Sequence, residues 1–252
     1  MRTGYMASVH ARAPVLDGSG IPGARAAPSP YSGAMTAFPS LDSLHPPFGL
    51  VLRAGDLTLR TLADADLPEY AALIRRPIFE DPDSAHVFGW ARNEPATRVR
   101  EALHFQWRLR TELSADAWTL PLGIWAGGRL IGCQDITAHR FAERRTVASG
   151  SWLTLDAHGK GYGTLMRQTM LTFAFDHLGA LRAESAAVVG NDASFAVSRR
   201  CGYADNGTQM SSEPGPAVLQ QRFLLTPERF RRPSVPVEVE GVTDELLALL
   251  GA

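Results

Sequence analysis

Alternation between apolar and polar residues predicts the first element of the folded region. Leu57, Leu59 and Thr61 alternate with polar side chains, as expected for a strand with one buried face. Asp64 or Asp66 follows as the cap of a helix that extends to about residue 75. The pattern therefore predicts a β-α unit at the start of this region.

A longer series of strands and helices follows. Val99, Leu103 and Trp107 lie four residues apart, which predicts a helix over residues 95–113. Alternation and glycine punctuation predict the other elements: strands over 118–125, 129–136, 147–155, 181–189, 203–209 and 218–225, helices over 163–178 and 191–200, and a short strand and helix within 237–252. Strands interleaved with helices predict a mixed α/β (α+β) domain, with the strand at 218–225 paired to the one at 203–209.

The first 50 residues differ from the rest in composition. They contain seven of the 17 prolines and six of the 23 glycines, and no helical or strand period is sustained. We expect a poorly ordered extension over residues 1–50, a folded domain over 51–232 and a strand and helix appendage over 233–252. Met35 offers an alternative start of translation.

Charge and cysteine content exclude some classes of binding partner and indicate a location for the protein. The formal net charge is −1, with both signs scattered along the chain, so we expect no nucleic acid and no membrane as partner. Cys133 and Cys201 lack His or Cys neighbours at metal-ligand spacing, which indicates free thiols and no metal. No leader and no apolar stretch of about 18 residues is apparent, so we expect a cytoplasmic protein.

The most informative segment runs from Ser151 to Thr164, where a predicted strand passes through a glycine-rich turn into a helix. Gly159, Gly161 and Gly163 occupy alternate positions. Backbone amides at the start of a helix are unpaired, and glycines let an anion approach them closely. The turn therefore predicts a phosphate-binding site, to which Lys160 adds a charge.

Two other phosphate motifs can be compared with this turn. A Walker loop requires Lys followed by Ser or Thr after its last glycine, and that pair does not occur here. A dinucleotide fingerprint requires a third glycine where Thr164 or Met166 stands, although Glu184 imitates the acidic residue that binds ribose. An NAD(P)-binding oxidoreductase remains a weaker alternative.

Two segments resemble motifs of the GNAT N-acyltransferase superfamily. The first is the turn His158-Gly-Lys-Gly161-Tyr-Gly163, which is similar to Gln/Arg-x-x-Gly-x-Gly/Ala except at its first position. The second is a helix starting Asn191-Asp-Ala-Ser194 and leading to Gly202-Tyr203, similar to the family's Asn-x-x-Ala/Ser helix before Gly-Phe/Tyr. The resemblance covers about residues 57–230. It is closest to the RimJ/RimL-like ribosomal-protein-alanine acetyltransferases and to actinobacterial relatives, some associated with succinyl-CoA.

This resemblance implies a GNAT fold. Its sheet has about seven strands, is mixed but mostly antiparallel, is flanked by helices, and is splayed between its fourth and fifth strands, which end near Leu155 and Val189. The pantetheine arm of an acyl-CoA is expected in that splay. Cofactor-binding residues carried over from the family motifs are Leu153, Thr154, Leu155, His158, Gly159, Lys160, Gly161, Tyr162, Gly163, Thr164, Asn191, Ser194 and Arg200. Asn191 could alternatively serve only as a helix N-cap.

Candidate catalytic residues follow from the needs of acyl transfer. Ser198 stands where many relatives have a tyrosine, so the resemblance implies that it stabilises the leaving sulfur; a serine bonded back to its own helix is the alternative. Main-chain amides around 153–155 are expected to polarise the carbonyl. The acid that often serves as base in the subgroup is replaced by Ala148. Asp135 is our choice of base, with Glu184 and His139 as alternatives.

The expected function is transfer of an acetyl or succinyl group from acyl-CoA to a primary amine of a protein or small molecule by direct attack. Without a strong base, an α-amine, whose reference pKa is about 7.7–8.0, is favoured over lysine at about 10.4. A non-catalytic acyl-CoA-binding module is the main alternative. Edge strands near the C-terminus need cover, which favours a homodimer.

Overall fold

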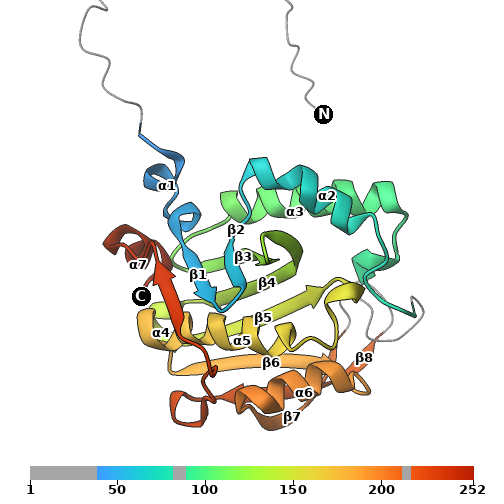
Figure 1. Cartoon of the computed structure of the whole chain (residues 1–252). Helices are drawn as coiled ribbons and strands as arrows, with labels where there is room; N and C mark the ends of the chain where they lie inside the picture. The colour runs from blue at the N-terminus through green and yellow to red at the C-terminus, as the bar shows by residue number, and fades with distance from the viewer. Residues whose placement is uncertain (1–38, 82–88, 212–216) are drawn as a thin grey trace, which may run out of the picture. The chain divides into compact units, whose positions relative to one another are not determined.

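The computed structural model describes residues 39–81, 89–211 and 217–252. Pro39–Ala252 form one compact unit built on a nine-stranded sheet in the order β7-β8-β6-β5-β4-β3-β2-β1-β9 (Figure 1). Neighbouring strands are antiparallel except β5 and β6, which are parallel. The predicted mixed, mostly antiparallel sheet is therefore confirmed, with nine strands in place of about seven.

The strands in chain order are β1 (Val51–Ala54), β2 (Leu57–Thr61), β3 (Ala117–Ala126), β4 (Arg129–His139), β5 (Thr146–Leu153), β6 (Arg182–Val188), β7 (Ala204–Ser211), β8 (Val218–Leu225) and β9 (Val237–Glu240). The α-helices are α1 (Leu41–Leu44), α2 (Leu67–Ile74), α3 (Pro95–Thr111), α4 (Phe141–Arg144), α5 (Tyr162–Thr172), α6 (Asp192–Cys201) and α7 (Asp244–Leu250). Short 3-10 turns are η1 (Pro46–Gly49), η2 (Asp64–Asp66), η3 (Gly89–Arg92), η4 (Leu155–Ala157) and η6 (Pro227–Arg229), and η5 (Phe173–His177) is a π-helical turn that continues α5.

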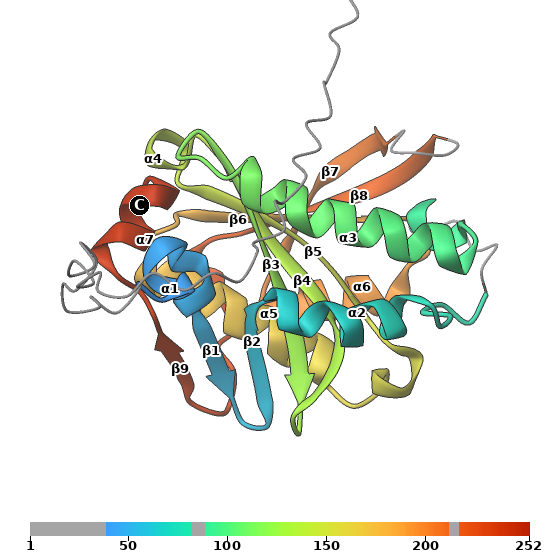
Figure 2. The ribbon, with the colours of Figure 1, turned by 90° about the horizontal axis from the view of Figure 1, so that it is seen from above.

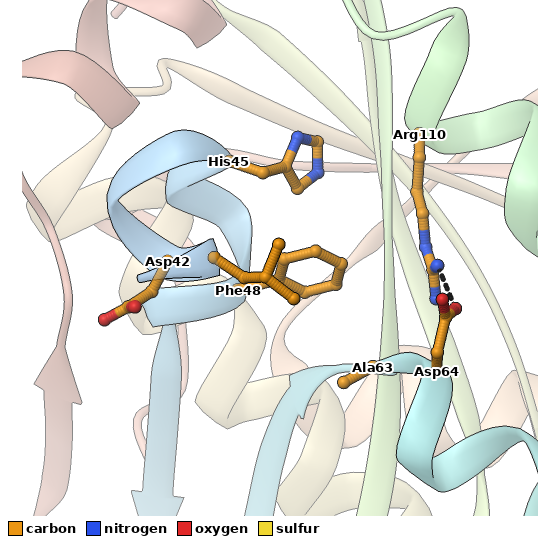
Figure 3. A pocket seen from close by; sticks show the side chains of 7 residues that line it. Asp42, His45, Phe48, Ala63, Asp64 and Arg110 are labelled. Atoms are coloured by element: carbon orange, nitrogen blue, oxygen red, sulfur yellow. Dashed lines mark hydrogen bonds and ion pairs between the residues drawn. The ribbon is translucent and has the colours of Figure 1, made fainter. Parts of the chain in front are cut away.

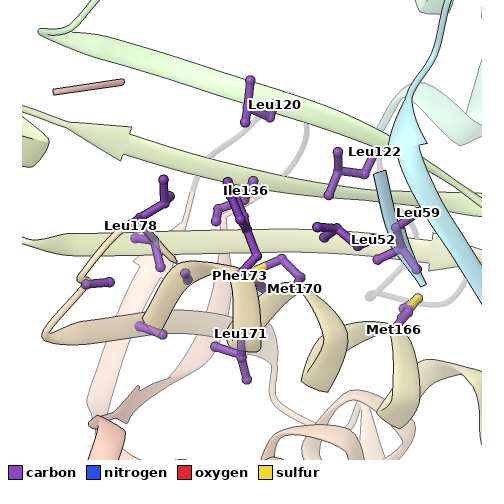
Figure 4. Close-up of a cluster of buried hydrophobic side chains, with 14 of the residues drawn as sticks. Leu52, Leu59, Leu120, Leu122, Ile136, Met166, Met170, Leu171, Phe173 and Leu178 are labelled. Atoms are coloured by element: carbon purple, nitrogen blue, oxygen red, sulfur yellow. The ribbon is translucent and has the colours of Figure 1, made fainter. Parts of the chain in front are cut away.

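Helices cover both faces of the sheet. Helices α2 and α3 lie over one face, and α5 and α6 lie over the other (Figure 2). The larger apolar core lies between the sheet and α5, where residues such as Leu122, Ile136 and Met170 are fully buried (Figure 4). A smaller cluster around Tyr70 and Cys133 packs beneath α2 and α3. Strands β3 and β4, in the middle of the sheet, therefore contribute residues to both clusters.

Both ends of the described unit differ from the domain limits expected from sequence. Residues 39–50 form α1 and η1, and Leu50 is fully buried, so the folded unit begins before residue 51. At the other end, β9 pairs with β1, and the Trp118 indole donates a hydrogen bond of 2.9 Å to the Leu250 carbonyl. The strand and helix expected within 237–252 are thus integral to the sheet and core. Residues 1–38, including Met35, lie outside the described residues.

Candidate functional site

Strands β5 and β6 run side by side for a short distance and then part. Their pairing is limited to Thr146↔Arg182, Val147↔Ala183 and Ala148↔Glu184. Beyond this point β5 pairs only with β4, and β6 pairs only with β8. We call residues 149–153 of β5 and 185–188 of β6 the fork. The expected splay is confirmed, and its apex lies at Ala148 and Glu184.

Hydrogen bonds at the end of β5 decide which backbone groups face the fork. The Thr154 amide donates to the Ile131 carbonyl at 2.8 Å, so Thr154 faces β4 and its amide is occupied. Backbone groups alternate in direction along a strand, so the Leu153 amide faces the fork. His158 Nε2 lies 3.1 Å from the Leu153 carbonyl and donates to it. Of the three amides expected to polarise a carbonyl, Thr154 is therefore excluded and Leu153 is retained, whereas Leu155 already belongs to η4.

The glycine turn after β5 has the conformation that an anion site requires. Gly159 and Gly161 have φ angles of 72° and 84°, which favour glycine, and no atom lies within 4 Å of a Cβ built at either position. Helix α5 begins at Tyr162 with Gly161 as its N-cap, one residue earlier than predicted. Lys160 is exposed beside these residues. In the part of the chain that the structure describes, no backbone acceptor is found for the amides of 159–163.

The turn is held in place from two sides. The Tyr162 hydroxyl donates to Asp56 at 2.9 Å, which ties the helix start to the β1–β2 hairpin. A Cβ at Gly163 would lie 3.3 Å from Val197 Cγ2, so this glycine permits close packing of α5 against α6. The Thr164 amide donates to the Gly161 carbonyl and closes the first turn. The third glycine of the motif therefore serves helix packing.

Helix α6 brings the second motif to the same side of the sheet. The Asn191 side chain accepts a hydrogen bond of 3.1 Å from the Ser194 amide, so the N-cap role considered for Asn191 is observed. The helix ends at Gly202, whose φ is 101° and where a Cβ would lie 2.1 Å from the Arg229 carbonyl oxygen. Arg200 is exposed on this helix. The Asn and Gly of the motif thus fix both ends of α6.

Ser198 is fully buried, and its Oγ has no hydrogen-bond partner among the described residues. The alternative that this serine bonds back to its own helix is therefore not observed. A buried hydroxyl without a partner costs about 1–3 kcal/mol, and such groups in proteins generally meet a partner in a ligand or water. Ser198 consequently has the free donor that a bound sulfur could use.

Asp135 lies on the opposite face of the sheet, beneath α2 and α3. It pairs with Gly150 in the β4–β5 ladder, and burial raises the pKa of its carboxyl to about 7. Tyr70 is nearby, 4% exposed, with its ring centroid 6.4 Å from that of Trp152. The Trp90 ring packs against Trp152 at 5.9 Å. A carboxyl group with this pKa can accept a proton near neutral pH.

The two alternative bases are less well placed. Glu184 forms part of the last β5–β6 pair, at the apex of the fork, and is half-buried. His139 is exposed at the end of β4. Asp135 is half-buried like Glu184, but it lies on the side of the sheet that α2 and α3 cover.

Sequence reasoning missed Arg167, a buried arginine at the fork. It is 4% exposed, and its guanidinium donates to Ser185 Oγ of β6 and to Ser151 Oγ of β5, both at 3.3 Å. The available signal was an arginine three residues before Met170, on a helix predicted to pack against the sheet. Its partners are 16 and 18 residues away, so the sequence pattern alone does not indicate them.

A surface hollow lies elsewhere, away from the fork and the glycine turn. It has a volume of about 510 Å³ and is lined by residues of α1, η1 and the 63–64 turn together with Arg110 (Figure 3). Asp64 pairs with Arg110 at its rim. None of the predicted site residues lines this hollow, so it is separate from the fork and the glycine turn.

Among the described residues, no helix is long and apolar enough to cross a membrane, and no cluster of His, Cys, Asp or Glu could hold a metal.

Comparisons with known proteins agree with this geometry. Residues 56–204 match the family model described as acetyltransferase (GNAT) domain. YdaF of Bacillus subtilis (strain 168), named as a candidate ribosomal N-acetyltransferase, is 28% identical over 161 residues, which cover 60% of this chain and 79% of YdaF.

Two solved structures share the fold. RimL, a ribosomal L7/L12 α-N-protein acetyltransferase in complex with coenzyme A, has a TM-score of 0.57 and 15% identity, covering 70% of this chain and 97% of RimL. Mycobacterium smegmatis RimJ in complex with a coenzyme A disulfide has a TM-score of 0.57 and 20% identity, covering 73% and 90%.

Proposed function

The chain belongs to the GNAT acetyltransferase family, and from this premise we propose that it transfers an acyl group from acyl-CoA to a primary amine by direct attack. The observation that carries this proposal is the fork between β5 and β6, which opens beside the glycine turn. The family match gives no support to the alternative of an NAD(P)-binding oxidoreductase, whose fingerprint lacks its third glycine.

The residues around the fork fit an acyl-CoA. The unpaired amides of 159–163 and the charge of Lys160 suit a pyrophosphate at the start of α5. The Leu153 amide suits the carbonyl oxygen of the thioester, and the unpartnered Ser198 hydroxyl suits its sulfur. Acyl-CoA supplies the activated acyl group, and this chain's residues hold it in line with the amine.

Asp135 is the proposed base. The neutral amine becomes cationic as its nitrogen bonds to the carbonyl carbon, so it must then lose a proton, and a carboxylate whose conjugate acid has a pKa of about 7 can accept that proton. Tyr70 and Trp152 lie in the apolar cluster on the same side of the sheet, and aromatic ring faces favour a cationic amine. The carboxyl group also lies on the same strand pair as Gly150, next to the fork.

The proposed acceptor is the α-amine of a protein N-terminus. YdaF is named as a candidate ribosomal N-acetyltransferase, and RimL as a ribosomal L7/L12 α-N-protein acetyltransferase. A base of pKa about 7 is better matched to an α-amine than to a lysine, which is neutral in only about one part in a thousand at pH 7. Rates on peptides with a free α-amine should exceed those on peptides with only a free ε-amine.

The acyl chain, the assembly and the location are also proposed. Acetyl is the first choice of chain, with succinyl as the alternative, and a screen of acyl-CoAs decides between them. A homodimer is proposed because β7 is an edge strand with Met210 64% exposed, and light scattering tests it. A cytoplasmic location fits the two free cysteines.

The deciding experiment measures release of free CoA from acetyl-CoA in the presence of a peptide with a free N-terminus. The proposal predicts peptide-dependent release together with acetylated peptide seen by mass spectrometry. Tight binding of CoA without release on any amine would instead support the non-catalytic binding module. Absence of both binding and release would remove the proposal.

A further inference from the structure

The guanidinium of Arg167 is buried at the fork. It spans the two arms, with Ser151 on β5 and Ser185 on β6. With its amide placed to suit both neighbours, Gln134 accepts a third bond, from Arg167 Nε at 3.2 Å. All three partners are neutral, and no carboxylate lies within 4 Å of this guanidinium in the described part of the chain.

A buried cation without a counter-ion is costly. A guanidinium stays protonated at any accessible pH, so it cannot avoid the cost by losing its charge. The penalty for an uncompensated buried ion is several kcal/mol, and neutral hydrogen-bond partners offset only part of it. Sites that must stabilise charge formed during a reaction hold such preorganised groups, because their charge is compensated only when the reaction proceeds.

Other unpartnered donors surround Arg167. Ser149 Oγ and the Tyr203 hydroxyl are buried and have no hydrogen-bond partner among the described residues. Ser149, Ser151 and Ser185 all point toward α5, since alternate residues of a strand share a face. The Tyr203 hydroxyl lies close to both Arg167 and Ser149. The fork therefore presents donors and a positive charge, which suits an anion.

The position of Arg167 relative to α6 indicates which anion. Cys201 lies one helical turn after Ser198, and its Sγ lies 4.0 Å from the carbonyl oxygen of Thr164, three residues before Arg167 on α5. Burial raises the pKa of the Cys201 thiol to about 11, and the Arg167 guanidinium is near enough to lower it in part. Burial likewise raises the pKa of Tyr203, and the same guanidinium lowers it in part. Arg167 therefore lies between the strand expected to hold the pantetheine arm and the helix that carries Ser198.

We propose that Arg167 is a further catalytic residue, which stabilises the negative charge on the coenzyme A sulfur as the acyl group leaves. The proposal rests on the proposed function. The amine nitrogen bonds to the carbonyl carbon, the carbon–sulfur bond breaks, and its electron pair stays on sulfur as a thiolate. The amine proton passes to Asp135. The thiolate is compensated by Arg167, with a hydrogen bond from Ser198.

The test is a titration of the thiol of CoA bound to the wild-type protein, followed by the ultraviolet absorbance of the thiolate. We expect the bound thiol to ionise at least about one pH unit below free CoA. Cys201 and Cys133 do not interfere, because burial raises the pKa of Cys201 to about 11 and that of Cys133 well above its usual value. CoA that binds with an unshifted thiol overturns the proposal, whereas CoA that does not bind overturns the proposed function.

Variants locate the effect. In Arg167→Met the thiol of bound CoA should return to the value of free CoA, and kcat with acetyl-CoA should fall by about 100-fold with little change in KM. Arg167→Lys keeps a positive charge, so the pKa of the bound CoA thiol should stay partly lowered. This variant provides the test if Arg167→Met fails to fold. Arg199→Met is the matched control, because Arg199 is an exposed arginine on α6.

A different role of Arg167 would give a different result. If Arg167 instead bound a carboxylate at the end of the acyl chain, the Arg167→Met variant would lose turnover of succinyl-CoA, while its turnover of acetyl-CoA would stay within about threefold of wild type. That outcome overturns the proposal.

Discussion

On the α5 side of strand β5, Ser149 and Ser151 point toward a buried guanidinium, whereas on the α2 and α3 side Gly150 and Trp152 lie beside the half-buried carboxyl group of Asp135. On the first side, Ser149 Oγ and Ser198 Oγ have no hydrogen-bond partner among the described residues. The second side has a proton acceptor in aromatic surroundings. Acyl transfer leaves a positive charge on the attacking amine and a negative charge on the departing sulfur. Because successive side chains of a strand point to opposite faces of the sheet, the group that could take the amine proton and the group that could stabilise the thiolate lie on opposite sides of β5.

The largest expected effect comes from removing the proton acceptor. Asp135→Asn should lower kcat/KM by about 10²–10⁴-fold, because the amide cannot accept a proton. In the wild type, kcat/KM should rise with pH through about 7, the pKa of Asp135, and this limb should disappear in the variant. A pH profile of both proteins checks it. Loss of the limb in Glu184→Gln but not in Asp135→Asn would move the base to the apex of the fork.

The same substitution should raise stability at alkaline pH. The folded-state pKa of about 7 lies above the ordinary value of 3.8, so the folded state holds the proton more tightly and stability is lost as pH rises between these values. Asparagine does not ionise, so Asp135→Asn should unfold with a free energy about 2–4 kcal/mol higher than wild type at pH 8, and with little gain near pH 4. Urea unfolding at both pH values measures this. Equal stability at pH 8 would show that the carboxyl group is better solvated than its burial indicates.

The glycine turn should respond to a smaller change. Gly161→Ala strains a left-handed residue among the free amides and should raise KM for acyl-CoA by roughly 10-fold. Gly127→Ala is the matched control, because Gly127 also has a positive φ of 54° and open space around its Cβ but lies in the β3–β4 hairpin. Initial rates over a range of acyl-CoA concentrations compare the two. Similar KM values in both variants would argue against a pyrophosphate at the turn.

The smallest effect is expected at Ser198. Ser198→Ala removes a hydroxyl that has no partner in the structure, so stability should not fall. If the hydroxyl bonds the leaving sulfur, kcat should fall by about 3–10-fold while Arg167 continues to carry most of the charge. Thermal unfolding and steady-state kinetics measure the two quantities. A larger loss of kcat in Ser198→Ala than in Arg167→Met would show that Ser198, and not Arg167, contributes most to stabilising the leaving sulfur.

The sequence predicted the glycine turn and the helix after it, but not the charged and polar groups that meet at the fork. Local chemistry made the turn at Gly159–Gly163 and the helix after Asn191 predictable, since glycine conformation and capping depend on neighbouring residues. Arg167 could not be assigned in this way, because its partners come from two strands that meet only in the folded sheet. Strand β1 has only four residues and was missed for lack of a sustained period.

For Asp135 the sequence suggested the residue but not the reason for its raised pKa. Its position near the end of a predicted strand suggested a base, but its shifted pKa depends on burial beneath α2 and α3. That burial comes from packing between elements far apart in the sequence. The pattern of residue types suggested the carboxyl group as a candidate, and only the tertiary structure supplies the cause of its raised pKa.

Hydrogen exchange of the wild-type protein with and without acetyl-CoA tests the central claim most directly. If the glycine turn and the fork hold the cofactor, exchange should slow in segments covering 149–153 and 159–165 and stay unchanged in the β3–β4 hairpin around Gly127. Exchange that is unaltered in the turn at saturating acetyl-CoA, or slowed only elsewhere, would contradict the account.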